Sequence, residues 1–377
     1  MRKRRPARPP SVRGTAGKQP AGKAAGARSV RVPEWRFQAE ERDRGFGVRQ
    51  GEEGGTAAAL GEPVHMVDRP VFIVGCPRSG TTWLQLLLAQ HPDVATAPET
   101  QIFSFYLDRF RRQWKEEHEG QASEHQGGAG LSRLLNEDEF QELCRSVAAS
   151  VLESIAARNP GASVLVEKSP RHALLADWIR DLFPEARFLQ VIRDPRDVAA
   201  SMFAAGATWA RWAPRGAVQA GRLWRDHVVA ARRARTDGAM YREVRYEALR
   251  ANPAKELGEV LAWLGLPATE ADIGSFVEKC ELSRLQRSAD GDSMPLPGRT
   301  SPRGFFRRGR VGGWRDELDR AAIRVVEEVC GDLMHELGYE RSTASSWRSR
   351  ARIRAHDIVQ RAREAIDWRL GRLAMRI

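Results

Sequence analysis

The stretch PVFIVGCPRSGTTWLQLLLAQH, residues 70–91, constrains the fold of this chain more than any other. Residues 70–76 form an unbroken apolar run rich in valine and isoleucine, which is typical of a strand covered on both faces. A glycine-containing turn follows, and residues 81–91 predict a buried helix. A buried strand that leads through a tight turn into a buried helix indicates an α/β protein.

The same alternation of strand and helix continues along the chain. Strands separated by helices predict a central parallel sheet with helices on both faces, a three-layer α/β fold. The polar stretch 104–150 is expected to lie as a lid over the carboxyl edge of that sheet. Further strands are predicted at 163–168, 186–194 and 242–249, and helices at 171–183, from 197 onward, and at 253–264, 270–279 and 315–337.

The positive charge of the chain lies at its two ends. Residues 1–33 contain ten Lys/Arg and no acid, and residues 342–377 contain nine Lys/Arg and three acids. The two ends together carry a formal charge of +16, whereas the whole chain carries +12. The residues between the ends therefore have a net charge of −4. A core domain built to bind nucleic acid is therefore disfavoured.

Composition divides the chain into three parts. Residues 1–65 are rich in Arg, Pro, Gly and Ala and are expected to be mostly disordered, with no specific nucleic-acid partner. Residues 66–341 carry the α/β pattern, and residues 342–377 predict a basic amphipathic helix that docks on the body, on a partner helix or on a membrane surface. Four scattered cysteines and the lack of a long apolar run favour a cytoplasmic protein without a zinc site.

The loop GCPRSGTT directs several backbone N–H groups, and the positive end of a helix dipole, at one point. A loop that binds a nucleoside triphosphate has a lysine where this chain has Thr81. The cation stands instead at Arg78, whose planar guanidinium can hold two anionic oxygens without a metal. The loop therefore predicts a site for a phosphate-ester anion. A kinase-like enzyme with a degenerate loop is the alternative.

Four motifs in sequence order extend this prediction. PRSGTTWL with HPD and ET after it resembles the 5′-phosphosulfate loop of the sulfotransferases that use 3′-phosphoadenosine 5′-phosphosulfate (PAPS). The resemblance covers roughly 70–340, and its loop is closest to the tyrosylprotein and carbohydrate branch. The basic-glycine loop is similar to that of the cytosolic branch. The other three motifs are FLQVIRDPRDVAASMF (188–203), RYEALRANP (245–253) and FFRRGRVGGWRDEL (305–318).

The resemblance implies a P-loop sulfotransferase-like fold and a set of residues that bind PAPS, whose product is adenosine 3′,5′-bisphosphate. The phosphosulfate would be held by the loop, the adenine by Trp83 and Tyr246, and the 3′-phosphate by residues of the second and third motifs. Arg308 stands where cytosolic members usually have lysine, which keeps the charge. The implied loop residues are Arg78, Ser79, Gly80, Thr81 and Thr82, and the implied 3′-phosphate residues are Arg193, Ser201, Arg307, Arg308 and Gly309.

The resemblance also implies in-line sulfuryl transfer to an acceptor hydroxyl or amine without a metal. Arg78 and Lys168 would stabilise the leaving oxygen, and the proton would go to Glu99, which is the base in the tyrosylprotein and carbohydrate branch. The cytosolic branch uses a histidine where this chain has Pro170. His172 follows two residues later and stays an alternative base, although it is expected to cap or pack the 171–183 helix.

The sequence leaves the acceptor open among small molecules, carbohydrates and peptides, because acceptor pockets are built from variable loops. Three tryptophans, Trp209, Trp212 and Trp224, are candidates for an aromatic acceptor site but are expected to pack in the core. A catalytically silent nucleotide-binding scaffold is a further alternative. The joint presence of Arg78, Glu99 and Lys168 argues against it.

Overall fold

The computed structural model describes residues 66–120, 130–235, 238–288 and 301–348, together with isolated positions between 350 and 358. The predictions for the N-terminal arm (1–65) and for most of the C-terminal basic helix therefore lie outside the described residues. None of the described helices is long and apolar enough to cross a membrane.

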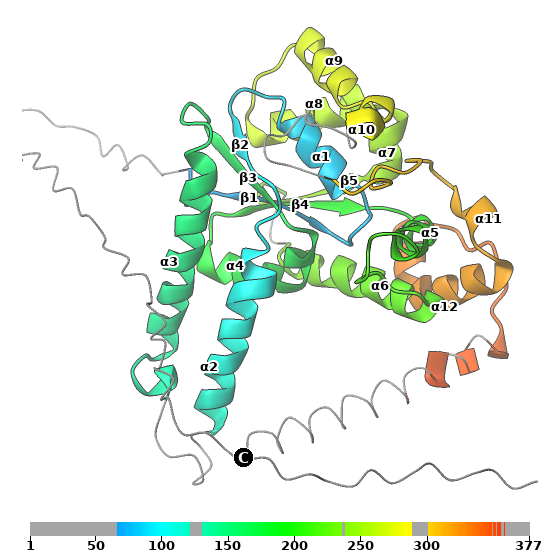
Figure 1. Cartoon of the computed structure of the whole chain (residues 1–377), viewed down its shortest axis with the longest axis horizontal. Coiled ribbons are helices and arrows are strands. Elements are labelled where there is room, and N and C mark those ends of the chain that lie inside the picture. Colours follow the sequence, from blue (N-terminus) through cyan, green and yellow to red (C-terminus); the bar gives the residue numbers. More distant parts are fainter. Residues whose placement is uncertain are drawn as a thin grey trace, which may run out of the picture. The chain divides into compact units, whose positions relative to one another are not determined.

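The described part of the chain contains a five-stranded sheet whose paired neighbours all run parallel, in the order β2-β3-β1-β4-β5 (Figure 1). The central parallel sheet predicted from the alternation of strands and helices is confirmed. The three-residue strand β2 was not predicted. The strands are β1 (Val71–Gly75), β2 (Val94–Thr96), β3 (Val164–Lys168), β4 (Arg187–Ile192) and β5 (Tyr241–Arg245).

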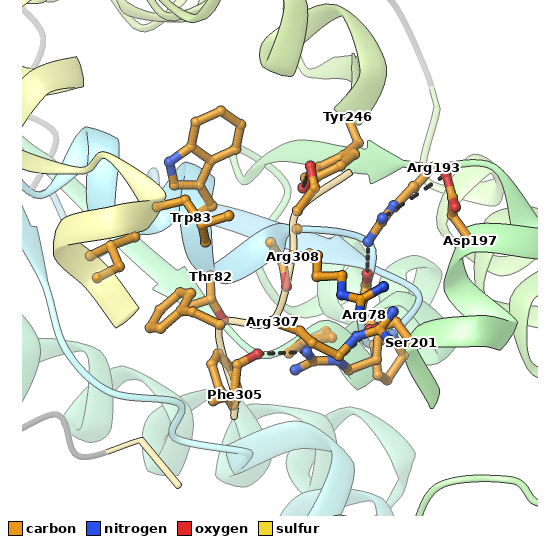
Figure 2. A pocket seen from close by; sticks show the side chains of 18 of the residues that line it. Arg78, Thr82, Trp83, Arg193, Asp197, Ser201, Tyr246, Phe305, Arg307 and Arg308 are labelled. Carbon is orange, nitrogen blue, oxygen red and sulfur yellow. Dashed lines mark hydrogen bonds and ion pairs between the residues drawn. The ribbon is translucent and has the colours of Figure 1, made fainter. Parts of the chain in front are cut away.

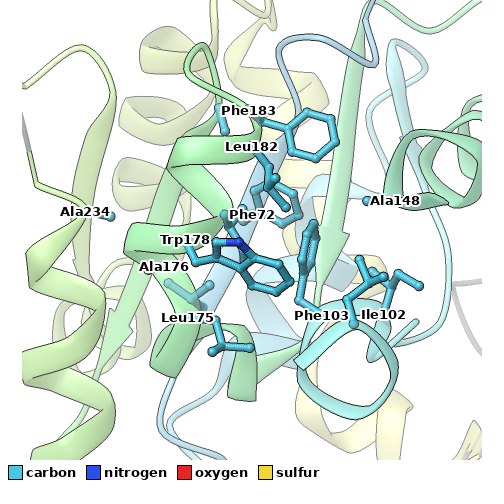
Figure 3. Packing of buried hydrophobic residues seen from close by; sticks show 14 of the residues in the cluster. Phe72, Ile102, Phe103, Ala148, Leu175, Ala176, Trp178, Leu182, Phe183 and Ala234 are labelled. Atoms are coloured by element: carbon cyan, nitrogen blue, oxygen red, sulfur yellow. The ribbon is translucent and has the colours of Figure 1, made fainter. Parts of the chain in front are cut away.

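Helices cover both faces of the sheet, as the three-layer prediction requires (Figure 1). Side chains alternate along β1, so Val71 and Ile73 pack with α1 (Thr81–Leu88) and α8 (Pro253–Leu264). Phe72 packs on the opposite face with Phe103 and with the helices named next, and Figure 3 shows part of this cluster. Those helices are α3 (Glu137–Ala156), α4 (Ala176–Leu182) and α6 (Ala217–Arg233).

The other helical elements are short or lie toward the C-terminus. The helix predicted at 315–337 is two helices, because Asp319 caps the second through the backbone N–H of Ala322 at 2.6 Å. The remaining elements are η1 (Ile102–Leu107), α2 (Asp108–Gly120), η2 (Leu131–Arg133), η3 (Pro170–Leu175), α5 (Pro195–Gly206), α7 (Tyr246–Ala251), α9 (Glu270–Lys279), α10 (Leu282–Ser288), α11 (Trp314–Glu317) and α12 (Arg320–Glu336).

The stretch 104–150 differs from the expected lid. Its described residues are largely helical, and α3 buries Phe140 and Cys144 in the core cluster that covers one face of the sheet. The apolar spacing along α3, rather than the polar composition of the stretch, decides this placement. Among the described residues of the stretch, Phe105 alone lines the cavity described below.

Packing continues past the predicted domain boundary at residue 341. The buried carboxylate of Glu327 in α12 accepts hydrogen bonds from the backbone N–H and hydroxyl groups of Ser342 and Thr343, at 2.5–2.9 Å. Arg196 of α5 also donates to Glu327, at 2.7 Å. A buried charge is stable only while such partners surround it.

We therefore expect a chain that ends at residue 341 to be less stable than one that ends at 346, by about 2–4 kcal/mol, because the shorter chain leaves Glu327 short of donors. Urea unfolding of the two truncated chains measures the difference. Equal midpoints would show that solvent replaces Ser342 and Thr343 without cost.

Candidate active site

A cavity of about 320 Å³ lies at the carboxyl edge of the sheet (Figure 2). All five strands are parallel, and predicted site residues lie at the carboxyl ends of four of them: the loop after β1, Lys168 at the end of β3, Arg193 after β4 and Tyr246 after β5. The carboxyl edge of an open parallel sheet is the usual place for a ligand. Predicted site residues that line the cavity are Arg78, Gly80, Thr81, Thr82, Trp83, Glu99, Arg193, Ser201, Tyr246, Arg307, Arg308 and Gly309.

The loop between β1 and α1 has backbone angles that require glycine at two positions. Gly75 (φ 150°) and Gly80 (φ 102°) adopt angles that L-residues rarely take, and a methyl group at either would come within 2.5 Å of another atom. At Gly80 that atom belongs to the ring of Tyr246, so the loop and the end of β5 are in close contact. Arg78 also has a left-handed backbone (φ 75°), which costs free energy in a non-glycine residue.

Three arginines from distant segments converge on this loop. Arg78 donates to the hydroxyl of Ser201 at 3.2 Å and to the carbonyl of Phe305 at 2.7 Å. Burial, and then the charges of Arg193 and Arg307, lower the pKa of Arg78 to about 10. Cations held this close repel one another, so the cluster is most stable when an anion lies between them.

Buried donors remain available in this cluster. The Nε atoms of Arg193 and Arg307 and the hydroxyl of Ser79 are buried and have no hydrogen-bond partner among the described residues. The other donors of Arg193 bond to the carbonyl groups of Arg78 and Arg310, at 3.2 and 2.9 Å. Backbone carbonyls thus orient this guanidinium, and its nearest carboxylate, that of Asp197, lies 4.0 Å from Nη2 (Figure 2).

The basic-glycine loop contacts both the cluster and the predicted adenine site. Arg307 pairs with Glu317 at 2.5 Å and Arg308 lies 3.6 Å from the same carboxylate. The carbonyl of Gly309, which has a left-handed backbone (φ 55°), accepts a hydrogen bond from the hydroxyl of Tyr246 at 3.1 Å.

Trp83 and Tyr246 meet edge to face, with ring centroids 6.1 Å apart. The indole N–H of Trp83 donates to the carbonyl of Cys280 at 3.0 Å, which fixes the ring. Arg250, which was not predicted, lies 5.0 Å from the Trp83 ring, and its spacing of four residues from Tyr246 on a helix was the available signal.

Lys168 and Glu99 form an ion pair next to Thr82, at the start of α1. Lys168 is fully buried, and its Nζ donates to Glu99 Oε1 and, at 3.2 Å, to the hydroxyl of Thr82. The second oxygen of Glu99 accepts from the side chain of Gln101 at 2.7 Å and the carboxylate is partly exposed to the cavity. One lysine therefore joins the glycine loop to the predicted base.

The structure does not bring His172 to the cavity with these residues. Its ring is fully buried among Phe72 and Phe103, 6.3 and 5.1 Å away between centroids. The backbone N–H of Phe103 donates to Nε2 at 3.2 Å, and Nδ1 lies 3.0 Å from the carboxylate of Glu167. Protein groups face both ring nitrogens, as expected of a histidine that packs its helix.

Aromatic residues form another part of the cavity wall. The guanidinium of Arg78 lies 5.4 and 4.8 Å from the ring centroids of Trp209 and Phe305, and these two rings contact each other with their centroids 5.4 Å apart. Trp209 and Trp212 line the cavity, contrary to the expectation of core packing, whereas Trp224 is buried and donates to the carbonyl of Arg193 at 2.9 Å. The loop 207–216, which joins α5 and α6, carries the first two rings to the cavity.

Among the described residues, no group of three or more His, Cys, Asp and Glu side chains is placed to hold a metal ion. The donors at the cavity are instead arginines, a lysine, hydroxyls and the glycine loop, a set that suits an anionic phosphate or sulfate ester.

The sheet and its glycine loop define the class, a parallel α/β protein with a glycine-containing loop between its first strand and the helix that follows. This chain belongs to the sulfotransferase family, whose model matches residues 70–270. It is 30% identical over 297 residues to the nodulation protein NoeE of Sinorhizobium fredii, an alignment that covers 72% of this chain and 66% of that protein. It is 28% identical over 234 residues to the protein-tyrosine sulfotransferase of Drosophila melanogaster, with 60% and 45% covered.

The chain thus spans less than two thirds of the length of each of these relatives. Among solved structures, the sulfotransferase domain of the Synechococcus PCC 7002 olefin synthase aligns with 74% of this chain and 98% of its own, at 21% identity and a TM-score of 0.47.

Proposed function

We propose that this protein transfers a sulfuryl group from PAPS to an acceptor hydroxyl or amine. The observation that carries the proposal is that Arg78, Arg193 and Arg307 line one cavity together with Glu99, which forms an ion pair with the buried Lys168. The cavity therefore offers arginines that can bind the 5′-phosphosulfate and the 3′-phosphate of PAPS, and a carboxylate, Glu99, that can accept the proton of the acceptor.

Two ends of the donor would meet two sets of residues. The glycine loop, with Arg78 and the two threonines at the start of α1, would bind the 5′-phosphosulfate. The free Nε atoms of Arg193 and Arg307 would donate to the 3′-phosphate, and Trp83 would pack against the adenine ring. A mouse sulfotransferase and a retinol dehydratase, whose structures contain the desulfated nucleotide PAP, are among the solved structures that align with this chain.

In the transfer step, the acceptor oxygen or nitrogen forms a bond to sulfur while the bond from sulfur to the bridging phosphate oxygen breaks. Glu99 takes the acceptor proton, and Arg78 and Lys168 stabilise the charge that grows on the bridging oxygen. Lys168 is within hydrogen-bond distance of both Glu99 and Thr82, so it links the two halves of the reaction.

The acceptor class stays open among small molecules, carbohydrates and peptides. The aromatic wall of Trp209 and Trp212 suits the face of a ring, whether aromatic or sugar. A cytoplasmic location and a docking role for the C-terminal basic helix stay predictions.

Binding of adenosine 3′,5′-bisphosphate is expected to be at least about 100-fold tighter than binding of AMP, because the 3′-phosphate gains charge-assisted hydrogen bonds from Arg193 and Arg307. Arg193→Gln should remove most of this difference and leave AMP binding nearly unchanged. Isothermal titration calorimetry with both nucleotides measures each affinity. Equal affinities in the unaltered protein would assign the arginine cluster to another anion.

Transfer from PAPS should continue in the presence of EDTA, and ATP should not be hydrolysed, since Thr81 replaces the lysine that grips a triphosphate. Release of adenosine 3′,5′-bisphosphate, followed by chromatography with and without the chelator, tests this. Activity that disappears with EDTA and returns with magnesium would favour the kinase-like alternative.

A further inference from the structure

A second carboxylate lies next to Lys168 but faces away from it. Glu167 of β3 is buried, and its Oε1 accepts hydrogen bonds from the hydroxyls of Ser169 and Thr100, at 2.7 and 2.8 Å. Burial alone would raise its pKa, but His172 and these hydroxyls lower that pKa to about 2. Glu167 therefore stays ionised at neutral pH, and the transfer mechanism does not use it.

Glu167, Ser169 and His172 accept hydrogen bonds from the turn formed by residues 99–103. The backbone N–H of Thr100 donates to Glu167 at 3.3 Å and that of Gln101 donates to the Ser169 hydroxyl at 3.0 Å. The backbone N–H of Phe103 donates to His172 at 3.2 Å. Three amides in four residues are thus tied to the end of β3 and the first turn of η3. The turn needs this support, since Gln101 has a left-handed backbone (φ 54°).

The hydrogen bonds around His172 determine which ring nitrogen carries the proton when the ring is neutral. Because Phe103 donates to Nε2 of His172, a neutral ring carries its proton on Nδ1, where it faces the carboxylate of Glu167 at 3.0 Å. Phe72 and Phe103 pack edge-on around the ring and restrict its rotation. The hydrogen bond from Phe103 therefore sets the tautomer of the neutral ring, the charge of Glu167 favours a proton on the nearby Nδ1, and the histidine holds the far end of the turn.

We infer that Glu167 and His172 are positioning residues that hold the 99–103 turn so that Glu99 stays beside Lys168. The inference rests on the proposed function, in which Glu99 is the base. It explains why a histidine near the strand end is buried behind the sheet edge rather than turned toward the acceptor.

The substitution Glu167→Gln tests this with almost no change of shape. Its amide group would donate to Nδ1 of His172, which moves the ring proton to Nε2 and sets it against the N–H of Phe103. Hydrogen exchange of the amides of residues 100–103 should then rise by about tenfold or more. The turnover number with PAPS and the probe acceptor p-nitrophenol should fall about tenfold, with little change in KM or in affinity for adenosine 3′,5′-bisphosphate.

A double substitution separates positioning from general loss of structure. If Glu167 acts through Glu99, the chain with both Glu99→Gln and Glu167→Gln should be no slower than the chain with Glu99→Gln alone. Glu327→Gln is the matched control, because it alters an equally buried carboxylate on α12 and should affect exchange at 342–343 but not at 100–103.

Unchanged exchange at 100–103 in the Glu167→Gln protein would overturn the inference. So would faster exchange with unchanged turnover, provided that Glu99→Gln slows the enzyme. If Glu99→Gln has no effect, the base assigned in the proposed function is wrong, while exchange still reports on the turn. That measurement needs no acceptor, so it remains decisive for the turn if p-nitrophenol is not sulfated.

Discussion

Replacing Arg78 with methionine is expected to lower the rate of sulfuryl transfer by about 10²–10³-fold, the usual loss when one preorganised donor to a developing charge is removed. Methionine keeps much of the length of the side chain and can still pack against Trp209 and Phe305. What it removes is the charge beside the phosphosulfate and the hydrogen bonds to Ser201 and Phe305. Single-turnover kinetics with radiolabelled PAPS isolates the chemical step.

The affinity for adenosine 3′,5′-bisphosphate should fall less than the rate, because Arg78 repels Arg193 and Arg307 in the absence of ligand. Arg242→Met provides the control. Arg242 lies on β5, forms an ion pair with Glu259 of α8 at 2.6 Å and does not line the cavity. A large loss of affinity with an unchanged rate of the bound complex would make Arg78 a binding residue only.

The pattern of the sequence was sufficient for the parts of the fold that depend on neighbouring residues. The β1–loop–α1 unit could be predicted because a strand, a glycine turn and a buried helix each have a local signature. The strand β2 could not, because Val94–Thr96 is too short to show a period and becomes a strand only by pairing with β3. The break between α11 and α12 depends on the cap at Asp319, whose signal lies inside an otherwise helical pattern.

The residues of the candidate site also fall into those that local motifs predict and those that depend on tertiary packing. Motifs predicted the arginines of the proposed anion site, and the structure places Arg78, Arg193 and Arg307 together although more than 100 residues separate each from the next. Motifs could not show that Glu167 and His172 face each other behind the strand end, or that Trp209 lies against Arg78. Such contacts depend on how the loops and helices pack, which no local pattern contains.

The substitution Glu99→Gln is expected to lower the rate of transfer by about 10²–10⁴-fold, or about 3–5 kcal/mol of barrier, with nearly unchanged affinity for adenosine 3′,5′-bisphosphate. The carbonyl oxygen of glutamine can still accept a hydrogen bond from Lys168, although its NH2 group cannot accept the one from Gln101. The turn should stay in place because its backbone amides bond to Glu167, Ser169 and His172. Glutamine has no basicity, however, and cannot take the acceptor proton. Pre-steady-state rates at several pH values measure the loss at the chemical step.

Comparison with His172→Asn distinguishes the two candidate bases. His172 is fully buried between Phe103 and Glu167, so it can affect the reaction only through the turn that it supports, and its loss should cost about tenfold. The rank order of the two substitutions is therefore the informative result. If His172→Asn were the slower variant, the histidine would have to leave its buried place and reach the acceptor during turnover. Equal and small effects would mean that the acceptor arrives already ionised, and an acceptor of low pKa would then react at the same rate in all three proteins.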